Sequence, residues 1–134
     1  MSHIFSFEKL EVWQDARFLA SKVYETTKNY TENERFGLTN QMRRAVLSVC
    51  SNIAEGSSRT STKDQAHFYQ MAFSSLNELL NQIIISQDLN YLNVDEGFTF
   101  RVQIEKISNK INALRKSTLN NNRLNASTNK RINK

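Results

Sequence analysis

The stretch FRVQIEKISNKINAL, residues Phe100–Leu114, has the most regular hydrophobic pattern in the chain. Its large apolar residues recur at intervals of four and three positions, as Phe100, Ile104, Ile107, Ile111 and Leu114. An α-helix advances about 100° per residue, so these side chains form one stripe along a helix. The pattern predicts a helix over residues 94–116, with Asp95 as its N-terminal cap.

Three earlier segments show the same helical periodicity. They predict helices over 7–29, 32–56 and 62–89, with stripes that include Leu19, Val46 and Leu76. The connectors between them are short and polar, and no alternation of strands and helices is visible. The sequence therefore predicts an all-α protein, an antiparallel up-down-up-down four-helix bundle over residues 1–116.

Capping residues are expected at the helix ends. Ser6 would cap the first helix, and Thr31 and Ser61 would open capping boxes for the second and third. Gly56 is expected to end the second helix as a residue in the left-handed conformation.

The positive charge is uneven along the chain. Residues 1–116 hold 14 basic and 13 acidic residues, a balance of +1, whereas residues 117–134 hold four basic residues and no acidic one. This last segment is rich in asparagine and poor in large aliphatic residues, so we predict a basic, disordered tail. The net charge of +5 thus gives no support for a basic surface over the whole bundle.

Composition argues against several functional classes. No apolar run approaches the roughly 18 residues of a membrane span, and no signal peptide is visible, so a cytoplasmic protein without a membrane partner is expected. The single cysteine, Cys50, is expected to be a small core residue. The sequence has no nucleotide-binding glycine loop or serine-nucleophile motif, and only Asp64 and His67 have metal-ligand spacing. We therefore expect no enzymatic activity, metal site or cofactor.

Five short motifs occur in order along the predicted helices. They are FEKLEVW (7–13), ERFGL (34–38), QMRRA (41–45), SNIAEG (51–56) and SLNEL (75–79). Over residues 5–116 this set resembles the 23S rRNA-intervening sequence protein family of bacterial four-helix bundles. The motif residues expected to serve the structure are Trp13, Gln41, Asn52, Glu55, Gly56 and Glu78.

The resemblance implies a protein without enzymatic activity. Some family members are encoded inside insertions within large ribosomal RNA genes. A related branch is the accessory protein of diversity-generating retroelements, which forms a five-membered ring that contacts a reverse transcriptase and nucleic acid. By this resemblance, a cyclic homo-oligomer is expected here, with five subunits as its expected form.

Four basic residues are candidates for phosphate contact. They are Arg43, Arg44, Arg59 and Lys63. The two adjacent arginines have alternative roles, as ion pairs with Glu78 or Glu34 or as contacts across a subunit seam. Arg59 and Lys63 could equally belong to an ordinary solvated loop.

Several apolar residues lie outside the core stripes, which suggests a buried subunit seam. The candidate interface residues are Leu47, Phe73, Phe98 and Val102. The first functional hypothesis is a homo-oligomer that binds RNA or a ribonucleoprotein. The alternative is an oligomeric adapter that recruits a protein, such as a reverse transcriptase, without touching RNA.

Overall fold

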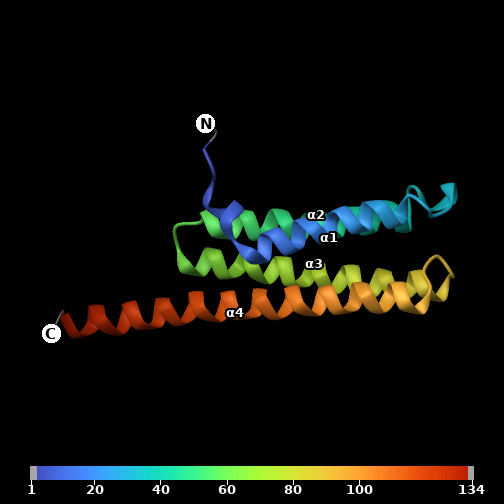
Figure 1. The fold of residues 1–134 in the computed structure, drawn as a ribbon. Coiled ribbons are helices and arrows are strands. Elements are labelled where there is room, and N and C mark those ends of the chain that lie inside the picture. Colours follow the sequence, from blue (N-terminus) through green and yellow to red (C-terminus); the bar gives the residue numbers. More distant parts are fainter. Residues whose placement is uncertain (1–2, 133–134) are drawn as a thin grey trace.

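The computed structural model describes the backbone of residues 3–132 and the side chains of residues 3–121. Within these limits it contains four α-helices and no strand (Figure 1). The helices are α1 (Glu11–Thr27), α2 (Leu38–Ser58), α3 (Thr62–Asp88) and α4 (Val94–Ile132). Two short 3-10 helices, η1 (Ser6–Lys9) and η2 (Glu32–Glu34), precede α1 and α2. The predicted all-helical architecture is confirmed.

Each helix packs against the next, and α4 closes the bundle against α1. In the described part of the chain the backbones of α2 and α4 do not come close to each other, so these helices occupy diagonally opposite corners. The predicted stripes meet in one core, where Leu19, Val46 and Leu76 are fully buried. Ile104, Ile107 and Ile111 of α4 are each at most 2% exposed, as their spacing predicts. Burial of this apolar surface is the main force that assembles the four helices.

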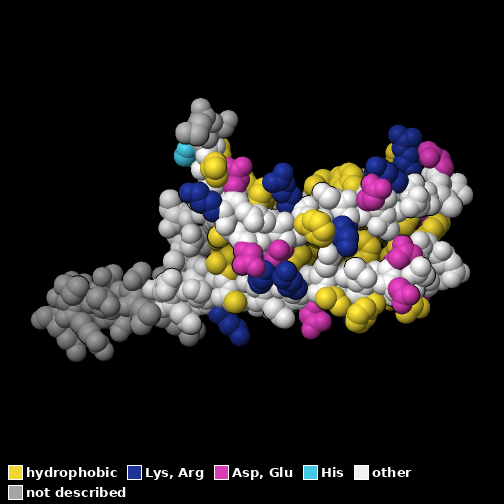
Figure 2. Space-filling model, viewed as in Figure 1, with side chains coloured by type: hydrophobic (Ala, Val, Ile, Leu, Met, Phe, Trp, Pro, Cys, Tyr) yellow, Lys and Arg dark blue, Asp and Glu magenta, His cyan; other side chains and the backbone are white. Residues whose placement is uncertain are grey.

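The α1–α4 seam also contains a group of charges, visible between these helices in Figure 2. The Lys110 ammonium donates to the carboxylates of Glu11 and Asp15 at 2.5 Å each. These hydrogen bonds raise the pKa of Lys110, which therefore stays charged at neutral pH. Lys106 adds a longer ion pair to Asp15 at 3.9 Å. The group links α4 to α1 along this seam.

The first two helices begin later than predicted. Ser6 starts the 3-10 helix η1, and α1 begins only at Glu11. The predicted capping box at Thr31 is wrong, because its hydroxyl lies 3.2 Å from the Tyr91 hydroxyl and makes no cap hydrogen bond. Instead α2 begins at Leu38, whose N–H donates to the Glu34 carboxylate at 3.3 Å.

Of the caps predicted for α3 and α4, the first is confirmed and the second is wrong. The Ser61 hydroxyl accepts from the Asp64 N–H at 3.1 Å, which confirms that cap. For α4 the prediction of Asp95 is wrong. The Asn93 side chain accepts from the Glu96 N–H at 2.8 Å, and the Glu96 carboxylate accepts from the Asn93 N–H at 3.2 Å. This reciprocal pair satisfies two free N–H groups at once.

Helix α4 is longer than its hydrophobic stripe. It continues beyond the predicted end at residue 116, through Ile132. Thr118 is only 8% exposed, and its hydroxyl donates to the Leu114 carbonyl at 2.9 Å. The first residues of the predicted tail thus belong to the bundle. The basic tail side chains Arg123, Lys130, Arg131 and Lys134 lie outside the described residues.

Among the helices described, none has the length and hydropathy needed to cross a membrane.

Candidate interaction surface

Arg43 is held by neutral partners inside the chain. Its Nε donates to the Thr27 hydroxyl at 2.9 Å, and its Nη2 donates to the Tyr24 carbonyl at 3.3 Å. Its guanidinium also lies over the Tyr24 ring, 4.6 Å from the centroid. The alternative of an ion pair with Glu78 or Glu34 is not observed. Arg43 therefore links α2 to the last turn of α1, where a positive charge also suits the helix dipole.

Arg59 is likewise committed to contacts within the chain. Its guanidinium pairs with the Glu55 carboxylate at 2.6 Å and lies 4.6 Å from the centre of the Phe68 ring. Its carbonyl accepts from the Gln65 side chain at 3.1 Å. These contacts fix the connection between α2 and α3, which gives both Glu55 and Arg59 a structural role.

Asn52 takes part in a polar link between α2 and α3. Its side-chain amide donates to the Ser48 carbonyl at 2.9 Å and to the Ser48 hydroxyl at 3.0 Å. That hydroxyl lies 2.9 Å from the hydroxyl of Ser75 on α3. Asn52 is 9% exposed, so this short network satisfies polar groups that would otherwise be costly to bury.

Gly56 has a different role from the one predicted. Helix α2 continues to Ser58, and no glycine of the described residues has a positive φ, so Gly56 does not end the helix in the left-handed conformation. A Cβ at this position would lie 2.7 Å from the Tyr69 ring and 3.2 Å from the Cβ of Phe68. Glycine is needed here because α2 and α3 approach closely.

Trp13 is half-buried at the start of the bundle. Its ring meets Phe7 edge-on, with 5.0 Å between the centroids, and the Arg17 guanidinium lies 5.6 Å from its centre. Trp13 thus packs the N-terminal segment against α1.

Arg44 differs from its neighbour, because it is exposed and makes no hydrogen bond or ion pair with the described residues. It lines an open depression of about 430 Å³ between α2 and α3, together with Phe36, Asn40, Gln41 and Glu78. The Glu78 carboxylate accepts only a 3.5 Å contact from the Gln82 amide. Two motif residues expected to be structural, Gln41 and Glu78, therefore lie on the surface beside an unpaired cation.

The four candidate cations do not form one cluster within a chain. Arg43 faces α1 and Arg44 faces the α2–α3 depression, whereas Arg59 and Lys63 lie at the other end of α2. At 1.5 Å per residue, Arg44 and Lys63 are about 20 Å apart along the bundle. Lys63, in the first turn of α3, is exposed and makes no ion pair among the described residues.

The candidate interface residues lie at two separate corners. Leu47 is 46% exposed on α2, and Phe98 and Val102 are 64% and 48% exposed on α4. Figure 2 shows hydrophobic side chains along the outer edge of the first part of α4. Phe73 is half-buried and lines a groove of about 320 Å³ between α3 and α4. Because α2 and α4 lie at opposite corners of the bundle, one chain carries two separate apolar patches, one at Leu47 and one at Phe98 and Val102.

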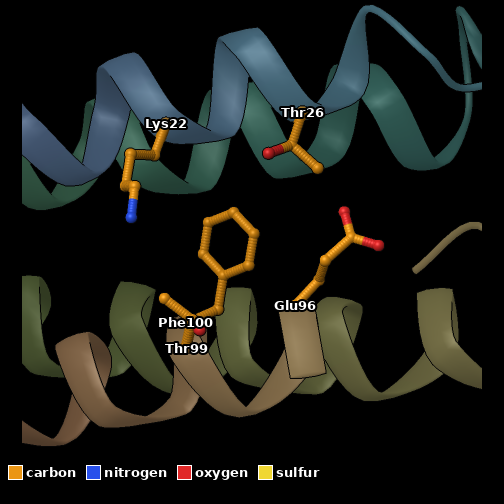
Figure 3. A pocket seen from close by; sticks show the side chains of 5 residues that line it. All are labelled: Lys22, Thr26, Glu96, Thr99 and Phe100. Carbon is orange, nitrogen blue, oxygen red and sulfur yellow. The ribbon is translucent and has the colours of Figure 1, made fainter. Parts of the chain in front are cut away.

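A cavity between α1 and α4 and the Cys50 thiol offer little chemistry. Figure 3 shows Lys22 and Thr26 of α1 facing Glu96 and Phe100 of α4 across a cavity of about 160 Å³. No nucleophile paired with a base lines this cavity. Burial raises the pKa of the Cys50 thiol to about 11, so the thiol is protonated at neutral pH. The described residues contain no cluster of three potential metal ligands.

Fold and surface together define a helical bundle with one apolar core and an exposed, unpaired arginine in the depression between α2 and α3. The model of the 23S rRNA-intervening sequence protein family matches residues 8–113, and the chain belongs to this family. The family expected from the motifs is thereby confirmed.

A solved structure supports the fold. It is a protein with unknown function from the S23 ribosomal protein family of Bacteroides thetaiotaomicron VPI-5482, similar with a TM-score of 0.71 and 18% identity. The match covers 78% of this chain and 98% of that one. No curated protein matches the sequence.

The contact at Gly56 gives a direct test of the α2–α3 packing. Gly56→Ala should lower the free energy of unfolding by about 1–3 kcal/mol, because the added methyl must displace the Tyr69 ring. Alanine favours helices over glycine, so any loss must come from this clash. Ser51→Ala, at an exposed position of the same helix, should change stability by less than about 0.5 kcal/mol. Urea denaturation measures both, and a Gly56→Ala variant as stable as the original chain would contradict the close contact.

Proposed function

We propose that this protein is a non-enzymatic, self-associating module that binds RNA or a ribonucleoprotein. The observation that carries this proposal is the unpaired Arg44 in an open depression lined by motif residues. A guanidinium with free N–H groups is suited to phosphate oxygens, which it can bind through two parallel hydrogen bonds. Lys63 supplies a second unpaired cation on the same pair of helices.

The charge of one subunit supports only weak binding. Arg43 points toward α1 and Arg59 pairs with Glu55, which leaves Arg44 and Lys63 as the candidate cations exposed on α2 and α3. Phosphate contacts gain affinity by releasing counterions, and two such contacts per chain release few. An oligomer that presents the same pair several times would bind much more tightly through avidity. The proposed RNA binding therefore depends on self-association.

The two apolar corners support a head-to-tail assembly. In this proposal the Phe98–Val102 patch of one subunit packs near Leu47 of the next. A contact between two different patches propagates from subunit to subunit, and it closes into a ring when the rotation allows. A ring of five subunits is the proposed form. We place the protein in the cytoplasm, where a lone cysteine such as Cys50 stays reduced.

A second candidate function is a protein adapter that makes no RNA contact. Its support is the mixed chemistry of the depression, which holds Arg44, Glu78 and two amides beside Phe36. Phe36 is 85% exposed, and its ring lies 5.5 Å from the Arg35 guanidinium. Arginine and aromatic side chains are enriched in protein–protein interfaces. A carboxylate in the same depression disfavours phosphate and favours a protein partner with charges of both signs.

Self-association can be tested at the Leu47 corner. We expect Leu47→Glu to convert the oligomer to monomers, because a buried, unpaired carboxylate is costly at an apolar seam. Light scattering at micromolar concentration measures the mass, and circular dichroism should show unchanged helix content. Met71→Glu serves as the control, because Met71 is similarly exposed on α3 but lies outside the proposed seam. A monomeric original chain would contradict the assembly.

RNA binding can be tested with a salt series. Replacing Arg44 and Lys63 by alanine should weaken binding and reduce the slope of log K against log salt by about one for each residue in each bound subunit. Lys116→Ala, which removes an exposed charge from α4, is the control. If the double variant binds as the original chain does, the assigned surface is wrong. If a chain ending at Asn121 loses all binding, the basic tail binds RNA and the bundle is better explained as an adapter.

A further inference from the structure

A cationic cavity of about 200 Å³ lies where the end of α1 meets the first turn of α2. Lys28, Arg35 and Arg43 line it, with Glu32 as the only carboxylate among the lining residues, and Glu25 pairs with Lys28 from outside the cavity, so one positive charge is in excess. We propose that this cavity binds a phosphate group, either free phosphate or the terminal phosphate of an RNA. Of the three cations, only Arg43 is among the candidates for phosphate contact from the sequence, and the cavity itself is new.

Two of the cations are held loosely. The Lys28 ammonium lies 3.3 Å from the Glu25 carboxylate, and the two side chains are 67% and 78% exposed. The Arg35 guanidinium lies 3.4 Å from Glu32, with exposures of 68% and 86%. Water screens exposed pairs of this kind, so they contribute little and exchange partners readily. A phosphate dianion can therefore attract both cations without breaking a strong interaction.

The third cation is fixed in position. Arg43 uses its Nε and Nη2 groups on Thr27 and Tyr24, whereas its Nη1 makes no hydrogen bond with the described residues. The guanidinium is half-buried and already oriented, so little side-chain entropy is lost when it binds an anion. Its bond to the Tyr24 carbonyl also offsets the negative partial charge at the end of α1.

The rest of the cavity wall is rigid and polar. Tyr30 is 8% exposed, and its ring stacks on Tyr91 with 4.8 Å between the centroids. Thr39, also 8% exposed, adds a hydroxyl from the first turn of α2. A fixed wall with a hydroxyl donor and three cations suits the oxygens of a phosphate better than an apolar ligand.

This cavity is separate from the proposed RNA surface. Adjacent residues of a helix point about 100° apart, so Arg43 faces the cavity beside α1 while Arg44 faces the depression beside α3. Loss of one site therefore leaves the other in place. The same cavity accepts free phosphate and a phosphorylated RNA end, because both present a dianionic group.

Titration of the full chain with inorganic phosphate tests the proposal. Amide NMR signals of residues 27–43 should shift saturably with phosphate at pH 7.5, and chloride at equal ionic strength should not produce these shifts. Lys28→Ala and Arg35→Ala should each weaken phosphate binding by about tenfold, because each removes one charge-assisted hydrogen bond. Both side chains are exposed, so neither variant should unfold the protein. Lys116→Ala, which removes an exposed charge far from the cavity in sequence, should bind phosphate as the original chain does.

A short RNA with a 5′-phosphate, compared with the same RNA carrying a 5′-hydroxyl, separates the two sources. Tighter binding of the phosphorylated RNA that Arg35→Ala removes would identify the RNA end as the ligand. Equal binding of the two RNAs, with saturable shifts from inorganic phosphate, would identify the free anion. The phosphate site would be overturned by NMR shifts that do not saturate with phosphate, or by a Lys116→Ala variant that loses as much phosphate affinity as Lys28→Ala and Arg35→Ala. Neither result depends on the outcome of the RNA test at Arg44.

Discussion

The close contact between α2 and α3 is the constraint on which the rest of the surface depends. At Gly56 the two helices approach so closely that a methyl group would meet the Tyr69 ring at 2.7 Å. Two turns earlier, the Ser48 hydroxyl meets the Ser75 hydroxyl across the same seam at 2.9 Å. Contacts at two levels fix both the distance between the helices and the rotation of α2 about its axis. That rotation determines where every other side chain of α2 points.

The rotation separates two adjacent arginines by function. It turns Arg43 toward α1, where the Thr27 hydroxyl and the Tyr24 carbonyl accept its hydrogen bonds. It leaves Arg44 in the open depression that Glu78 also lines. The SNIAEG and QMRRA motifs are thus coupled through the helix that carries both. The first fixes the helix, and the second supplies one structural and one unpaired cation.

Much of the fold was predictable, because four periodic stripes can be buried only against each other. The ends of the helices were harder to predict, because each depends on single hydrogen bonds. The start of α2 depends on the bond from the Leu38 N–H to the Glu34 carboxylate. At the start of α4, Asn93 rather than Asp95 is the cap. The left-handed role given to Gly56 was wrong because glycine also permits close packing, and the sequence around it does not show that Tyr69 lies opposite. The roles of the two adjacent arginines stayed open in the sequence, because the partners of Arg43 come from another helix. The α4 extension was missed because it lacks a stripe of large aliphatic residues.

The most direct test of this account compares the stability of two single variants by urea denaturation. Arg43→Ala should lower the free energy of unfolding by about 1.5–3 kcal/mol, because it removes two hydrogen bonds from a charged group and leaves Thr27 and Tyr24 without that partner. Arg44→Ala should change it by less than about 0.5 kcal/mol, as expected for an exposed side chain without partners. Equal losses in the two variants, or a larger loss at Arg44, would contradict the division of the motif into a structural and an unpaired arginine.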